Sequence, residues 1–141
     1  MITKTERNET VVLERELCVM APNTPGQLAR LTSALRSAGV NLLGVTTVNV
    51  GAKACLRFLA DEAVQAKAVL EEAGYKVSER PVFLIPMRNR GEDLDRLASE
   101  LGARGINILS CYGHEENGAL KLVLAVDRPD QAAPLLVRLS R

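Results

Sequence analysis

The fold is decided by two stretches, LARLTSALRSAGVNLL (28–43) and LDRLASELGARGINIL (94–109), because the second repeats the first at an offset of 66 residues. Carried on without a gap, residues 28–75 match residues 94–141 at thirteen of 48 positions, where composition alone would give about four. A repeat at a fixed offset indicates that one structural unit is built twice along the chain.

Each copy has the periodicities of a small α+β unit. In the first copy Gly39 ends a helix, Gly51 marks a hairpin turn, and Asp61 is placed as the N-cap of a second helix. The predicted elements are strand 17–21, helix 25–38, strand 40–50, strand 54–60, helix 61–73 and strand 75–80. Their order is βαββαβ, which is the ferredoxin-like plan.

The second copy follows the same order until the chain ends at Arg141, before a fourth strand. Asn117-Gly118 is a hairpin signal, and Asp127 is placed as a helix cap. The predicted elements are strand 82–87, helix 92–103, strand 106–114, strand 120–126 and a last helix that begins near Pro129. We therefore predict an α+β protein with two ferredoxin-like βαββαβ units in tandem, the second lacking its last strand, and antiparallel sheets with helices on one face.

Three segments follow from the repeat: an N-terminal extension over 1–14, a first unit over 15–80 and a second over 81–141. The missing strand leaves a sheet edge open, and open edges invite pairing. The β-rich stretch Val11 to Leu13 lies outside the repeat. We expect it to cover an edge, either in its own chain or in a second copy.

Composition excludes several classes of function. The chain has 141 residues and a formal net charge of +1, with 3% aromatic residues and no Trp. It therefore lacks the basic footprint and the stacking platforms of a nucleic-acid-binding protein. The polar start is not a signal peptide, and no apolar window of membrane-spanning length exists. Cys18, Cys55 and Cys111 are predicted to be buried reduced thiols, which is typical of a cytoplasmic protein.

No catalytic or metal-binding constellation is recognisable. His114, the only histidine, makes a Cys-x-x-His spacing with Cys111, but a metal site needs three or four ligands. A strand end beside the Asn117-Gly118 turn explains this spacing more simply. Walker and GxGxxG phosphate-binding motifs are absent. We predict a protein without cofactor or metal that is not an enzyme; an enzyme with an unrecognised site is the weakest alternative.

The loop between the first strand and the first helix is the candidate binding site. It runs through Asn23, Thr24, Pro25 and Gly26 into Gln27 and Leu28. Such a loop places backbone N–H groups at a helix start, where anions bind, and Gly26 would let a ligand approach the backbone. A tight turn with a helix cap explains the same residues without a ligand.

The same residues resemble the ACT domain, an amino-acid-sensing regulatory module. Asn23, Gly26, Leu28, Gly39, Val40, Asn41 and Leu42 match its loop and helix-end motifs in the first unit, and Asn89, Leu94, Gly105, Ile106, Asn107 and Ile108 match in the second. The resemblance covers residues 15–141 and is strongest to stand-alone proteins made of two ACT units. It implies a binding site between the first loop of one unit and a neighbouring surface.

The resemblance implies that Asn23 and Asn41 contact an amino acid, with Asn41 near the same loop, and that Asn89, Gly91 and Asn107 form the matching set in the second unit. In serine-sensing ACT domains a histidine lies two residues before the first asparagine. Ala21 and Met87 stand there in this chain, so the identity of the amino acid stays open.

The two loops differ in charge. Glu92 and Asp93 follow Gly91 in the second unit and would oppose a bound carboxylate, although Arg88 or Arg90 would offset this. We therefore expect the first unit to hold the better amino-acid site.

The resulting prediction is a cytoplasmic regulatory or sensor protein, a homodimer, that binds an amino acid and modulates a metabolic enzyme or its own assembly. The alternative is a ligand-free scaffold subunit that pairs through its sheet edges with such an enzyme.

Overall fold

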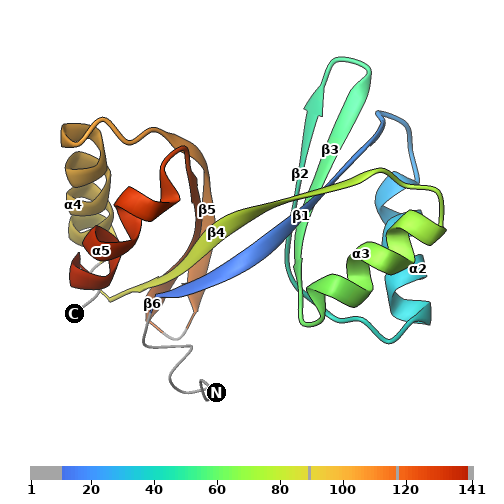
Figure 1. Ribbon diagram of the computed structural model, residues 1–141, viewed down its shortest axis with the longest axis horizontal. Coiled ribbons are helices and arrows are strands. Elements are labelled where there is room, and N and C mark those ends of the chain that lie inside the picture. The colour runs from blue at the N-terminus through green and yellow to red at the C-terminus, as the bar shows by residue number, and fades with distance from the viewer. Residues whose placement is uncertain (1–10, 89, 117, 140–141) are drawn as a thin grey trace. The chain divides into compact units, whose positions relative to one another are not determined.

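The computed structural model describes residues 11–88, 90–116 and 118–139, which form two compact units (Figure 1). The first unit comprises Arg15–Arg80. The second unit combines the chain from Pro81 onward with the segment that ends at Glu14. The second unit is therefore discontinuous in sequence, and the first is inserted into it.

The first unit has the ferredoxin-like strand order β2-β3-β1-β4, and α2 and α3 lie on one side of its strands (Figure 1). Its elements are β1 (Val12–Pro22), α2 (Gln27–Ser37), β2 (Leu42–Val50), β3 (Lys53–Ala60), α3 (Ala63–Glu72) and β4 (Val77–Met87), of which β1 and β4 continue into the second unit.

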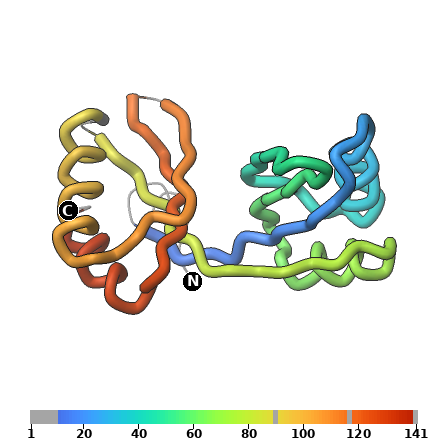
Figure 2. Tube along the Cα trace, turned by 90° about the horizontal axis from the view of Figure 1, so that it is seen from above, coloured from blue at the N-terminus to red at the C-terminus, as the bar shows by residue number. Residues whose placement is uncertain are grey.

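The second unit has the equivalent strand order when read from the opposite edge, β5-β6-β4-β1, with β1 in the place that β4 has in the first unit. Its further elements are α4 (Arg90–Ala103), β5 (Ile108–Glu116), β6 (Ala119–Val126) and α5 (Pro129–Leu139). Figure 2 shows α4 and α5 on the same side of β4, β5 and β6. Both units are thus ferredoxin-like, as the repeat predicts.

The fourth-strand position of the second unit is filled from the opposite end of the chain. Residues 81–139 contain no fourth strand among the described residues; the first residues of β1 take its place beside β4. Val12 is buried there, and Val11 packs against the second unit's core. This segment therefore lies within its own chain's second unit.

Each unit has its own hydrophobic core between its helices and its strands. Alternate side chains of β1 and β3 face the helices in the first unit, and those of β4 and β6 do so in the second. The buried first core is Leu17, Val19, Ala21, Leu31, Leu35, Val40, Leu56, Phe58, Ala60, Ala66 and Leu70. The buried second core is Phe83, Ile85, Met87, Leu97, Leu101, Ile106, Leu122, Leu124, Val126, Ala132, Leu135 and Leu136.

Several predicted boundaries were wrong for local reasons. The first helix begins at Gln27 and not at Pro25, because Gly26 has a left-handed φ of 90° that no α-helix contains. The strands predicted over 75–80 and 82–87 are one strand, β4, which passes through Pro81. The fixed φ of proline suits an extended backbone, so this residue does not end the strand.

The cysteine prediction was correct only in part. All three thiols are free. Cys55 is buried and Cys18 half-buried, whereas Cys111 on β5 is exposed. β5 is the edge strand of its sheet, where side chains are more accessible than in the middle of the sheet. Among the described residues, no helix has the length and apolar character needed to cross a membrane.

Candidate functional site

The loop from Asn23 to Gly26 connects β1 to α2 on the surface of the first unit, with every residue exposed. Asn23 ties it to the hairpin that joins β2 and β3. Its backbone N–H donates to the carbonyl of Ala52 at 2.9 Å, and its side-chain Nδ2 donates to the carbonyl of Gly51 at 3.2 Å. The side chain thus fixes the loop while its Oδ1 atom stays available as an acceptor.

No side chain caps the start of α2. Gly26 occupies the N-cap position without a side-chain hydrogen bond, and the first turn carries no acidic residue. Thr24 is engaged elsewhere, since its Oγ1 accepts from Gln27 Nε2 at 2.8 Å. The first helical bond runs from the Arg30 N–H to the Gly26 carbonyl at 3.0 Å. The N–H groups before it, including that of Leu28, form the positive end of the helix dipole.

Asn41 does not join this loop within the first unit, so the prediction that it lies beside the loop was wrong. Pro22, at the end of β1, is opposite Lys53, at the start of β3. Leu42, at the start of β2, is opposite Ala60, at the end of β3. Asn41 and Asn23 therefore lie at opposite ends of the same three strands.

Asn41 instead forms a three-bond pair with Asp61. The Asn41 N–H donates to Asp61 Oδ1 at 3.0 Å and its Nδ2 to Oδ2 at 3.1 Å, while the Asp61 N–H donates to the Asn41 carbonyl at 3.1 Å. The pair joins the start of β2 to the end of β3. The backbone hydrogen bond from Asn41 is the main cause that lowers the pKa of the exposed Asp61 carboxyl.

The predicted role of Asp61 as a helix cap was therefore wrong. The N-cap position of α3 is Glu62, without a side-chain cap bond, and the Asp61 carboxylate holds the strand start. The hydrogen bonds to Asp61 thus give Asn41 a structural role within the first unit.

The same pair recurs in the second unit. The Asn107 N–H donates to Asp127 Oδ1 at 2.9 Å, and the Asp127 N–H donates to the Asn107 carbonyl at 3.1 Å. A spacing of twenty residues separates Asn from Asp in both units. Two of the repeat's thirteen identities, 41/107 and 61/127, thus encode the same structural contact in each unit, and their equal spacing was the sequence signal for it.

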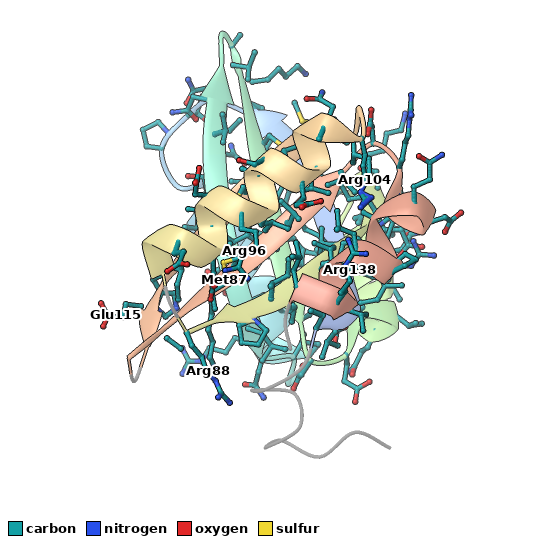
Figure 3. The ribbon with its side chains drawn as sticks, turned by 90° about the vertical axis from the view of Figure 1, so that its left-hand side faces the viewer. Met87, Arg88, Arg96, Arg104, Glu115 and Arg138 are labelled. Atoms are coloured by element: carbon teal, nitrogen blue, oxygen red, sulfur yellow. The ribbon has the colours of Figure 1, made fainter. Side chains whose placement is uncertain are left out.

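The corresponding loop of the second unit differs from the first. Asn89 lies outside the described residues, and Gly91 belongs to the first turn of α4 rather than to a loop. Glu92 and Asp93 place negative charge in that turn, and Glu92 pairs with Arg96 at 3.6 Å. Figure 3 shows the Arg88 side chain extending from the end of β4 away from α4. This helix start is therefore electrostatically unlike that of α2.

A shallow hollow of about 450 Å³ lies between α2 and the start of β2. Its lining is mixed: Thr32, Ser33, Arg36 and Asn41 are polar, and the remaining lining residues, Ala29, Leu35, Val40 and Leu42, are apolar. It adjoins the Asn41–Asp61 pair and is separate from the Asn23 loop. Among the described side chains, no group of three His, Cys, Asp or Glu residues is arranged to hold a metal ion.

Comparison with known proteins shows a likeness in structure only. No protein-family model and no curated protein sequence matches this chain. Protein BT0572 from Bacteroides thetaiotaomicron is similar with a TM-score of 0.83 and 21% identity, over 89% of this chain and 88% of that one.

Two regulatory subunits of aspartate kinase have the same architecture. The subunit from Thermus thermophilus, in its ligand-free form, has a TM-score of 0.64 and 17% identity over 92% of this chain and 93% of its own. The subunit from Thermus flavus has a TM-score of 0.66 and 17% identity over 93% and 94%. The tandem ferredoxin-like fold predicted from the repeat is thus shared with these structures over nearly the whole chain.

Proposed function

We propose that this chain is a non-catalytic regulatory protein that binds an amino acid at the loop Asn23–Leu28 and thereby modulates an enzyme or its own assembly. One observation carries the proposal: α2 begins after an exposed glycine, Gly26, and no side chain caps its first N–H groups. Its free N–H groups suit the carboxylate of an amino acid. The Oδ1 atom of Asn23 is an acceptor for the ammonium group.

The surroundings of Gly26 favour close approach of a ligand. A Cβ atom built on Gly26 meets nothing within 4 Å, so the space above the helix start is open. Because α4 begins with Glu92 and Asp93, its start already holds negative charge, and the proposal assigns binding to the first unit. The fold that this chain has in common with regulatory subunits of aspartate kinase supports a regulatory role with an enzyme partner.

The test is a thermal-shift screen of the full chain against the twenty amino acids. A ligand that binds only the folded state at 100 times its Kd adds about 2.7 kcal/mol of stability, enough to raise the melting temperature visibly. A hit supports a sensor. No hit at millimolar concentrations contradicts the proposal and favours the ligand-free scaffold subunit.

A pair of substitutions then places the site. Asn and Asp both tolerate a left-handed backbone and have the same size, so Gly26→Asn and Gly26→Asp differ only in charge. We expect Gly26→Asp to abolish the shift through repulsion of the ligand carboxylate, while Gly26→Asn retains most of it. Glu92→Ala serves as the control in α4 and leaves the shift unchanged. Equal binding by both Gly26 variants would exclude the start of α2 as the carboxylate site.

A further inference from the structure

The sheet face of the first unit that points away from its helices carries two thiols. Leu17 and Val19 of β1 face the helices, so the alternating Cys18 faces the other side, as does Cys55 of β3. The Sγ atoms of Cys18 and Cys55 lie 3.0 Å apart. In the β1–β3 register Cys18 is opposite Arg57, which makes the two cysteines diagonal neighbours.

A positive charge lies beside both sulfur atoms. Arg57 is opposite Cys18 in the β1–β3 register and two residues from Cys55 along β3, so its side chain leaves the sheet on the same face as both thiols. Burial, followed by the hydrogen bond with Cys55, raises the pKa of the Cys18 thiol, and Arg57 acts in the opposite direction. A thiolate formed at this place is therefore stabilised by the positive charge of Arg57.

The geometry is close to that of a bonded pair. The separation of 3.0 Å between the sulfur atoms is only about 1 Å longer than a disulfide bond. We propose that Cys18 and Cys55 form a reactive dithiol that a hydroperoxide converts to a disulfide, with Arg57 as the positioning residue. The half-buried Cys18 is the more accessible of the two and reacts first.

The reaction balances without any further reagent. The Cys18 thiolate attacks the terminal oxygen of the hydroperoxide, the O–O bond breaks, and the departing alkoxide takes a proton to become an alcohol. Cys18 is then a sulfenic acid. The Cys55 sulfur attacks it, the S–S bond forms, and hydroxide leaves with the Cys55 proton as water. Two thiols are oxidised and one peroxide is reduced.

The second unit provides an internal contrast. At the offset of 66 residues, Leu84, Lys121 and Val123 stand where the first unit has Cys18, Cys55 and Arg57. Their register is the same, since Leu84 is opposite Val123. The thiol pair is therefore an addition to the first unit, which the fold itself does not need.

The disulfide would join the strands that support the candidate loop. β1 leads directly into Asn23, and the Asn23 N–H bonds to Ala52 just before β3. Oxidation would thus lock the strand pair whose ends hold this loop.

The test treats the reduced full chain with one equivalent of hydrogen peroxide and then counts thiols with a maleimide in denaturant. We expect two of the three thiols to be lost, a Cys18–Cys55 linked peptide in a non-reducing digest, and full recovery with dithiothreitol. Cys111→Ser should still form the link, whereas Cys18→Ser and Cys55→Ser should each form none. Retention of both thiols while Cys111 reacts, or scrambled links through Cys111, would overturn the proposal.

A second measurement tests the role of Arg57 with a readout that does not depend on the stability of the variant. The rate at which iodoacetamide alkylates Cys18 is followed against pH in the Cys55→Ser/Cys111→Ser background. Arg57→Gln should move this profile to higher pH, and Arg104→Gln, at a surface pair on α4, should leave it in place. An unmoved profile for Arg57→Gln would remove Arg57 from the mechanism.

Discussion

Arg80→Met should destabilise the protein more than any surface Arg→Met change, because it leaves the buried Glu16 carboxylate without its Arg80 partner. Glu16 of β1 is only 1% exposed, and its Oε1 accepts from Arg80 Nε at 2.8 Å and lies 2.7 Å from the second guanidinium nitrogen of Arg80. Removal of one partner of a buried pair costs about 3–5 kcal/mol, since a buried charge is left uncompensated. Glu16 has further interactions of its own, so we expect the lower end, about 3 kcal/mol.

The assay is urea unfolding followed by far-ultraviolet circular dichroism. With a slope of about 2 kcal/mol per molar urea, the midpoint should fall by about 1.5 M. Arg104→Met is the matched control. Its partner Glu100 lies 3.6 Å away on the exposed face of α4, with side-chain exposures of 43% and 41%, so the loss should stay below about 0.5 kcal/mol.

A double variant, Glu16→Leu/Arg80→Met, separates charge from packing. Replacement of both charges by apolar side chains removes the uncompensated carboxylate and should recover most of the lost stability. If Arg80→Met costs no more than Arg104→Met, or if the double variant is less stable than Arg80→Met, Arg80 does not stabilise the protein by compensating the charge of Glu16.

Three further outcomes follow from the structure. The lowered pKa of Asp61 means that its stabilising effect is full above the unfolded-state pKa and is lost as the pH falls through the folded-state value. The urea midpoint of wild type should therefore exceed that of Asp61→Asn at pH 7, with a difference that shrinks below about pH 4; a constant difference would contradict this. In α3, Leu70→Ala at a fully buried position should cost about 2–5 kcal/mol, whereas Val64→Ala at an 88% exposed position should stay within about 0.5 kcal/mol; similar losses would refute the assigned core. At Gly26, with its φ of 90°, Gly26→Ala should lower the free energy of unfolding by about 1 kcal/mol and Gly26→Asn by less. Thermal unfolding of both variants measures these losses, and equal losses would argue against the left-handed conformation.

The repeat made most of the fold predictable. Residues such as Leu31 and Leu35 recur at helical spacing and are buried as expected, and the glycines at 39 and 105 both have the positive φ of a helix end. These signals are local, so a single sequence contains them in full. The unbroken β4 was missed because Pro81 separates a polar segment from an apolar one, and nothing in the sequence shows that one strand runs through this proline.

The candidate site was less predictable, because it depends on which strand ends meet. The sequence indicated the Asn23 loop and its glycine. It did not indicate that Asn41 lies at the far end of the sheet, since that follows from the β1–β3 and β2–β3 registers. The diagonal contact between Cys18 and Cys55 also depends on register, and these residues are 37 positions apart.

The use of the first residues of β1 as the fourth strand of the second unit has a consequence for synthesis of the chain. The first residues of β1 leave the ribosome before any other described element, yet their partners in the second unit come after Pro81. The inserted unit Arg15–Arg80 is complete in the meantime and can close around its own core. The leading segment therefore has no partner in the second unit until the part of β4 after Pro81 has been made. A fragment cut after Arg80 would keep this unsatisfied edge, and a fragment that starts at Pro81 would lack the strand that completes its sheet.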